Sequence, residues 1–181
     1  MKKIYLIRHC EAKGQQPEAT LTNNGYRQAL HLAEFFSNKQ VDRIISSPYR
    51  RAIESIEPLG YRLNMDIEID ERLTERVLSS ENLSDWFEKL RATFWDHELK
   101  FDGGESSQEA MNRIVQVVGE IFEHETKNTI IVTHGNLMSL LLHYYDKEFG
   151  FKEWKNLSNP DVFLLTLYNY RANFSRLWNT N

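Results

Sequence analysis

The chain has 181 residues, of which 41% are hydrophobic and 27% are charged, and its formal net charge is −4. A chain of this length can form one domain that buries a core without disulfides or metal. The charge is spread along the sequence without a basic block, which argues against a nucleic-acid partner. The single cysteine cannot form an intramolecular disulfide, and no apolar stretch approaches the roughly 20 residues of a membrane span. We therefore expect a cytoplasmic protein with no membrane partner.

The first third of the chain predicts two strands, each followed by a helix. Residues 3–8 are a short, mostly apolar run bounded by polar residues, which indicates a buried strand. Apolar side chains recur at helical spacing in residues 21–39, with Thr22 as the expected N-cap. Residues 41–47 predict the second strand, and the helix after it is expected to begin at Pro48, because proline suits the first helical position.

The middle of the chain is less regular. Residues 65–70 predict a short third strand, and residues 71–82 an irregular segment. Two further helices are expected at residues 83–98 and 105–126, on either side of a glycine-containing turn.

The last third begins with the clearest buried strand, at residues 128–133, followed by an apolar helix over residues 135–145. Two β-rich segments, 161–170 and 174–180, are expected to pair around a turn at residues 171–173. Strands alternate with helices along the chain, which predicts an α/β fold. We expect a three-layer α/β/α sandwich around a mixed, mostly parallel sheet.

Polar side chains follow three of the predicted strands at the point where each strand ends. The first strand delivers Arg8 and His9. The second delivers Ser47 and, one helical turn later, Arg50 and Arg51, and the strand before the apolar helix delivers His134. Ligands of open α/β sheets bind outside the carboxyl ends of the strands, and a helix N-terminus favours an anion. Each feature alone is common in structural roles, but together they predict an anion site at one edge of the sheet.

Six stretches also resemble the motifs of a known family, in that family's order. They are "LIRHCEA", "LTNNGYRQA", "SSPYRRAIES", "ERLTER", "GGESSQEAMNR" and "IIVTHGN". Several are individually common, but together they are specific and span roughly residues 3–140. The chain resembles the histidine phosphatase superfamily, in the branch that includes the phosphoglycerate mutases. The resemblance implies a phosphoglycerate mutase-like fold and phosphoryl transfer without a metal or cofactor.

The resemblance also implies roles for individual side chains. His9 matches the nucleophile, and an imidazole suits this role because much of it is neutral near pH 7. A backbone carbonyl that accepts from Nδ1–H would leave Nε2 as the attacking atom. Arg8, Arg51 and His134 match the residues that hold the phosphate oxygens, for which the planar guanidinium is well suited. Arg51 is chosen over Arg50 because the family pattern places alanine after the arginine. His134 is expected to be protonated when phosphate is bound.

The general acid has two candidates in "DERLTER". Glu75 matches the family's "L-x-E" pattern after the third strand, and Glu71 is a competitor four residues earlier. Either carboxylate could instead form a surface ion pair with Arg72 or Arg76. We favour Glu75.

Two positions depart from the family pattern. Many members have glycine after the nucleophilic histidine, and this chain has Cys10. A thiol near two cationic groups could have a lowered pKa and be sensitive to oxidation, but we favour a packed and inert thiol. Many members also have a Trp-Asn pair where this chain has Gly14 and Gln15. Gln15 could still offer an amide donor, so it is a candidate substrate-binding residue.

Residues 76–101 are expected to form a cap-like insertion in a single domain spanning residues 1–181. An apolar stripe with rough helical spacing runs through this segment and comprises Trp86, Phe87, Leu90, Phe94 and Trp95. Such a stripe more often packs onto the domain than faces a pocket. If part of it faces the pocket, the substrate carries an apolar or aromatic group.

Hydrolysis is favoured over transfer because mutases that resemble this chain are longer and have a glycine-rich continuation where "VLSSEN" stands here. We predict a metal-independent phosphatase that hydrolyses a small phosphomonoester through a phosphohistidine on His9. Two alternatives remain: a mutase-type phosphoryl transferase, and a non-catalytic phosphate-binding regulatory protein. No histidine has partners at metal-ligand spacing. Monomer and homodimer both remain open.

Overall fold

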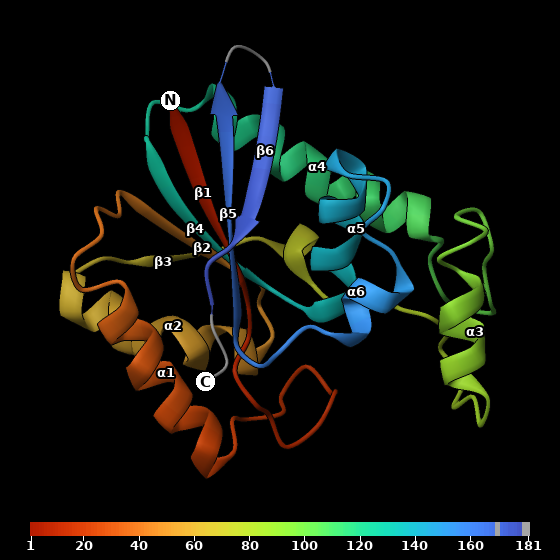
Figure 1. Cartoon of the computed structure of the whole chain (residues 1–181). Helices are drawn as coiled ribbons and strands as arrows, with labels where there is room; N and C mark the ends of the chain where they lie inside the picture. The colour runs from red at the N-terminus through yellow and green to blue at the C-terminus, as the bar shows by residue number, and fades with distance from the viewer. Residues whose placement is uncertain (169–170, 179–181) are drawn as a thin grey trace.

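The computed structural model describes residues 1–168 and 171–178, and its centre is a six-stranded sheet with the order β3-β2-β4-β1-β5-β6 (Figure 1). The strands are β1 (Lys2–Arg8), β2 (Arg43–Ser46), β3 (Ile67–Ile69), β4 (Asn128–Thr133), β5 (Asp161–Tyr168) and β6 (Arg171–Arg176). The first four strands, β1 to β4, all run parallel to one another. Strand β5 is antiparallel to β1, and β6 is antiparallel to β5. The predicted mixed, mostly parallel sheet is confirmed.

Helices cover both faces of the sheet (Figure 1). They are α1 (Asn23–Phe35), α2 (Arg50–Leu63), α3 (Trp86–Ala92), α4 (Ser107–Glu123), α5 (Gly135–Tyr145) and α6 (Phe151–Lys155), with a 3₁₀ turn, η1, at Glu71–Leu73. Side chains of β1 alternate between the two faces, as the pleat requires. Ile4 and Leu6 pack with α4 and α5, whereas Tyr5 and Ile7 pack with α1 and α2. The three-layer α/β/α prediction is therefore confirmed.

The helix after β2 begins two residues later than predicted. Ser47 still belongs to the sheet edge, because its backbone N–H donates to the carbonyl oxygen of Val132 at 2.9 Å. The chain turns only after that bond, so Tyr49 becomes the N-cap residue and Arg50 the first residue of α2, in place of Pro48. By contrast, Thr22 is the predicted N-cap of α1, where its hydroxyl oxygen accepts from the Gly25 N–H at 2.9 Å.

Other boundaries also differ from the prediction. Helix α3 covers only part of the expected 83–98 range, because the turns after Ala92 tighten to bonds between residues three apart, such as Phe94 N–H to Arg91 O at 3.1 Å. The short helix α6 was not predicted. The expected turn at 171–173 is wrong, since these residues lie in β6 and pair with β5. The parts of the predicted strands at 169–170 and 179–180 lie outside the described residues.

Part of the apolar stripe in residues 76–101, here called the cap segment, packs onto the rest of the protein, as favoured, and part of it is exposed. Phe87 and Phe94 pack onto α6, with ring centroids 5.4 Å and 5.5 Å from that of Phe151. Trp95 is 81% exposed and Trp86 is 51% exposed. Figure 1 shows α3 at the margin of the molecule, away from the sheet. Aromatic contacts with α6 therefore hold this segment against the rest of the protein. No helix within the described ranges is long and apolar enough to cross a membrane.

Candidate active site

His9 lies immediately after β1 and is fixed on three sides. Its backbone N–H donates to Thr133 O at 3.0 Å, which extends the pairing of β1 with β4 by one residue. The Asn159 side-chain amide donates to the His9 carbonyl oxygen at 2.8 Å. On the ring, Nδ1 lies 2.7 Å from the carbonyl oxygen of Cys10. A carbonyl oxygen can only accept, so Nδ1 carries the proton and the lone pair is on Nε2.

Arg51 lies beside that lone pair. Its Nε donates to His9 Nε2 at 3.2 Å, and its Nη1 donates to the carbonyl oxygens of Gln15 and Gln16 at 3.0 Å and 2.9 Å. The Arg51 residue is 1% exposed, whereas the Arg50 side chain is 63% exposed. Of the two neighbouring arginines, the structure places Arg51 at His9 and Arg50 at the surface.

His134 is the second imidazole at this edge of the sheet. It follows β4, it is fully buried, and its ring centroid lies 5.1 Å from that of His9. Its Nε2 lies 2.7 Å from the hydroxyl oxygen of Ser47, which the second predicted strand was expected to deliver at this same edge. The ends of three adjacent parallel strands, β1, β4 and β2, thus bring His9, His134 and Ser47 together.

Both imidazoles are neutral at neutral pH. Burial is the main cause that lowers the pKa of His9 to about 3, and the neighbouring Arg51 and Arg8 guanidinium groups add to it. Burial, and then the proximity of His9 and Arg51, holds the pKa of His134 well below its ordinary value. A bound phosphate dianion would favour the protonated form of His134, so its expected protonation in the loaded site stays a prediction.

Glu75 caps the helix that follows His134. Its Oε2 accepts from the Asn136 N–H at 3.0 Å, and its Oε1 accepts from the Leu137 N–H at 2.9 Å and from the Arg76 N–H at 2.9 Å. The first-turn amides of α5 that were expected to favour an anionic ligand are therefore partly engaged by this carboxylate. The competing carboxylate, Glu71, is an exposed residue at the start of η1. The structure brings Glu75 to the site.

Arg8 lies against the N-terminus of α5. Its Nη1 donates to the carbonyl oxygens of Leu157 and Ser158 at 3.1 Å and 3.3 Å, which ties the segment before β5 to the site. A Cβ at position 135 would lie 3.0 Å from Arg8 Nε, so Gly135 makes this close approach possible. Burial lowers the pKa of Arg8 below its ordinary value, and Glu75 and Asp161 oppose that effect.

Unpartnered polar atoms concentrate at this site. Among the described residues, the buried side-chain nitrogen and oxygen atoms without a hydrogen-bond partner belong to Arg8, Arg76, His134 and Asn136. Such groups normally find partners, because an unpaired buried one costs about 1–3 kcal/mol. A ligand with several acceptor oxygens would pair the nitrogens. Asn136 was not predicted as a site residue, although it directly follows the "HG" of its motif, and Arg76 was expected only as an ion-pair partner.

A cleft of about 510 Å³ adjoins these residues. Its lining comprises Arg8, Gln15, Glu75, Arg76, Leu78, Trp86, Leu90, Gly135, Asn136 and Trp154. Sites for small molecules commonly enclose roughly 300–1,000 Å³. The cleft can therefore hold an organic group beside Arg8 and Glu75, and Gln15 borders it.

Cys10 is packed rather than reactive. The residue has no exposed surface, and burial raises the pKa of its thiol to about 12. The favoured expectation of an inert, packed thiol agrees with the structure. The alternative of a lowered pKa is wrong, because burial outweighs the side-chain hydrogen bond with Ser55, which lowers the pKa. Within residues 1–168 and 171–178, no group of three or more histidine, cysteine or acidic side chains is arranged to hold a metal ion.

The lowered pKa of His9 predicts a measurable dependence of stability on pH. The unfolded chain binds a proton near pH 6.5 and the folded chain only near pH 3, so stability falls as the pH decreases from 6.5 towards 3. Between pH 7 and pH 5, the free energy of unfolding of His9→Gln should fall by about 2 kcal/mol less than that of the wild type. Urea unfolding at the two pH values measures this, with His31→Gln, at an exposed histidine of α1, as the matched control. Equal losses in the wild type and His9→Gln would contradict the neutral state of His9.

Comparison with known proteins supplies the family. The sequence profile of the histidine phosphatase superfamily (branch 1) matches residues 4–180. Phosphoserine phosphatase 1 of Hydrogenobacter thermophilus is 26% identical over 147 residues, which cover 73% of this chain and 70% of that protein. A Proteus mirabilis protein named "Probable phosphoglycerate mutase GpmB" is 27% identical over 160 residues, covering 78% and 74%.

The fold agrees as well. The structure of a mycobacterial glucosyl-3-phosphoglycerate phosphatase with inorganic phosphate superposes with a TM-score of 0.80 at 24% identity, covering 99% of this chain and 98% of that one. Both the family and the phosphoglycerate mutase-like fold implied by the six motifs are thus confirmed. The chain belongs to the histidine phosphatase superfamily, branch 1.

Proposed function

We propose that this protein is a metal-independent phosphatase that hydrolyses small phosphomonoesters through a phosphohistidine on His9. The observation that carries the proposal is a buried, neutral imidazole with the proton on Nδ1 and an Nε2 lone pair that faces an arginine. Neutral imidazole is the nucleophilic form, and the fixed cations beside it can meet the charge of a phosphoryl group.

In the first step, Nε2 of His9 forms a bond to phosphorus, and the bond from phosphorus to the ester oxygen breaks. Arg51 gives up its hydrogen bond to Nε2 and donates instead to the phosphoryl oxygens, together with Arg8 and His134. These donors are already in place before the reaction starts, so they stabilise the charge that develops on those oxygens. Glu75 lines the cleft beside Arg8. In its protonated form it gives its proton to the departing alkoxide, which leaves as an alcohol.

In the second step, water attacks the phosphorus of phosphohistidine. The Glu75 carboxylate accepts a proton from that water, and the bond between phosphorus and Nε2 breaks. Inorganic phosphate is released, His9 regains its lone pair, and Glu75 is protonated for the next cycle. The Gln15 and Asn136 amides border the same cleft and are proposed to bind substrate oxygens.

Hydrolysis is proposed over transfer on two grounds. Two of the three similar proteins described above are named as phosphatases and one as a mutase. The cap segment that borders the cleft is short, and its Trp86 side is open to solvent, which admits the water that a phosphatase needs. A non-catalytic binding protein would not need a neutral nucleophile and a carboxylate at one site. We further propose that the enzyme acts in the cytoplasm, as a monomer or homodimer.

The proposal predicts turnover that depends on His9 and not on a metal. With excess chelator, the wild type should release phosphate from p-nitrophenyl phosphate, and His9→Ala should lose at least about 10³-fold in kcat/KM because the nucleophile is gone. His31→Ala, at an exposed histidine of α1, should match the wild type. Activity that survives in His9→Ala, or vanishes with chelator, would overturn the mechanism.

The two acidic candidates can be separated by leaving group. Glu75→Gln should lower kcat/KM for an alkyl phosphate, which reports only the first step, by about 10²–10⁴-fold, because an alkoxide needs a proton as it departs. The effect on p-nitrophenyl phosphate should be much smaller, since nitrophenolate leaves unprotonated. Glu71→Gln should change neither rate. Steady-state kinetics with both esters decides the assignment, and equal losses on both esters for Glu75→Gln would exclude it as the acid.

A further inference from the structure

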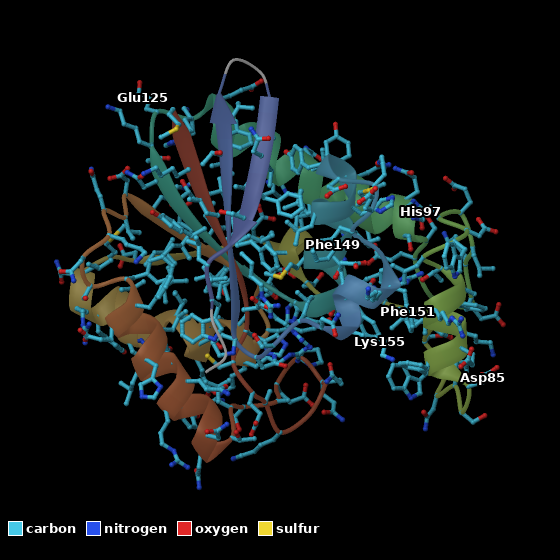
Figure 2. The ribbon with its side chains drawn as sticks, viewed as in Figure 1. Asp85, His97, Glu125, Phe149, Phe151 and Lys155 are labelled. Atoms are coloured by element: carbon cyan, nitrogen blue, oxygen red, sulfur yellow. The ribbon has the colours of Figure 1, made fainter. Side chains whose placement is uncertain are left out.

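The cleft beside the phosphate site has an apolar wall that the proposed reaction does not use. Trp86 and Leu90 come from α3, Leu78 from the segment before it, and Trp154 from α6. Figure 2 shows Phe151 and Lys155 of α6 on the side of the body that faces α3. Two elements about 70 positions apart in the sequence thus each place an indole at one cleft.

Trp154 is held rigidly in this wall. Its ring stacks on Phe151 with centroids 5.4 Å apart and an interplanar angle of 29°, and it lies 6.0 Å from the Phe94 ring of the cap segment. A side chain that is already fixed loses little conformational freedom when a ligand binds. The cluster of Phe87, Phe94 and Phe151 therefore both anchors the cap segment and prepares one indole to contact a ligand.

Trp86 contributes the second indole from the opposite element. It is 51% exposed and has an edge contact with Phe87, at 5.5 Å and 88°. Because the Trp86 indole is half exposed, a ligand in the cleft would cover part of its apolar surface. The free energy gained is proportional to the apolar area removed from water. Trp95 belongs to the same segment and is 81% exposed, yet it is not part of the cleft lining.

The charged groups of the cleft are less suited to bind a small acidic leaving group than the apolar wall is to bind an apolar one. Arg8 and Glu75 belong to the proposed reaction. Arg76 is 5% exposed, its Nε donates to Glu105 O at 3.0 Å, and its Nη1 donates to Thr93 Oγ1 at 2.9 Å. These bonds hold the Arg76 guanidinium between Thr93 and Glu105 and leave only a buried Nη2 unpaired. The apolar wall is the larger exposed feature.

We infer that this cleft is a leaving-group subsite that selects phosphomonoesters whose alcohol part carries an aromatic ring or a flat apolar group. The inference rests on the proposed function, because the phosphate of such an ester must lie at His9. The ring would lie between the cap segment and α6 and contact the indoles of Trp86 and Trp154, where offset or edge-to-face contacts are favourable.

The test compares phosphate esters of three primary alcohols, so that the leaving groups are of one kind and none is an activated phenolate. 2-Phenylethyl phosphate should have a kcat/KM at least about tenfold above those of ethyl phosphate and O-phosphoserine, as expected for a matching apolar pocket. Trp86→Ala and Trp154→Ala should each lower this preference about threefold or more, mainly by raising KM for the phenylethyl ester, because binding is lost equally in ground and transition states.

Two matched variants complete the test. Trp154→Phe keeps an aromatic ring and should retain most of the preference, and Trp95→Ala should leave it unchanged. If Trp154→Ala does not fold, Trp86→Ala carries the test, because its half-exposed indole is less important for folding. The subsite is overturned if O-phosphoserine is the better substrate, or if both alanine variants keep the wild-type preference while turnover continues. Absence of phosphate release from every ester would instead overturn the proposed function, and the subsite with it.

Discussion

The hydrogen bond from His9 Nδ1 to the carbonyl oxygen of Cys10, 2.7 Å long, fixes which nitrogen of the ring is free. The rest of the site depends on it. With the proton held on Nδ1, the lone pair of Nε2 points towards Arg51, and burial keeps the ring from taking a second proton. A local backbone contact therefore sets the tautomer, and the low polarity around it preserves the nucleophilic form.

The sheet supplies the precision that this chemistry needs. Backbone bonds from His9 to Thr133 and from Ser47 to Val132 continue the ladders just beyond β1 and β2. The reacting groups consequently stand on rigid strand ends rather than on free loops. The cost is electrostatic: Arg8, Arg51 and Arg76 are all desolvated, which lowers their pKa values. Buried cations with unpaired N–H groups are favourable only if an anion joins them, which accords with phosphate as the ligand.

The sequence predicted the fold and the participants at the sheet edge because both depend on local patterns. Apolar runs that end in Arg8–His9 and Thr133–His134 mark strand ends, and parallel strand ends meet at one edge. Local patterns could not predict contacts between segments that lie far apart in the sequence, nor very short elements. Asn159 reaches His9 across 150 positions, and α6, with five residues, is too short to show a helical period. Charge near Cys10 was visible in the sequence but the extent of its burial was not, so a lowered pKa stood as an alternative to the packed, inert thiol that was favoured.

The central claim is that the phosphoryl group is carried on Nε2 of His9. The most direct measurement mixes the enzyme with a phosphomonoester, quenches the reaction in alkali, where phosphohistidine survives, and locates the phosphoryl group by peptide mass spectrometry and ³¹P NMR. The account predicts one phosphoryl group per chain on His9, with the chemical shift of the Nε2 isomer. Phosphorylation at Nδ1 or at another residue, or full turnover with His9 unmodified in every quenched sample, would contradict it.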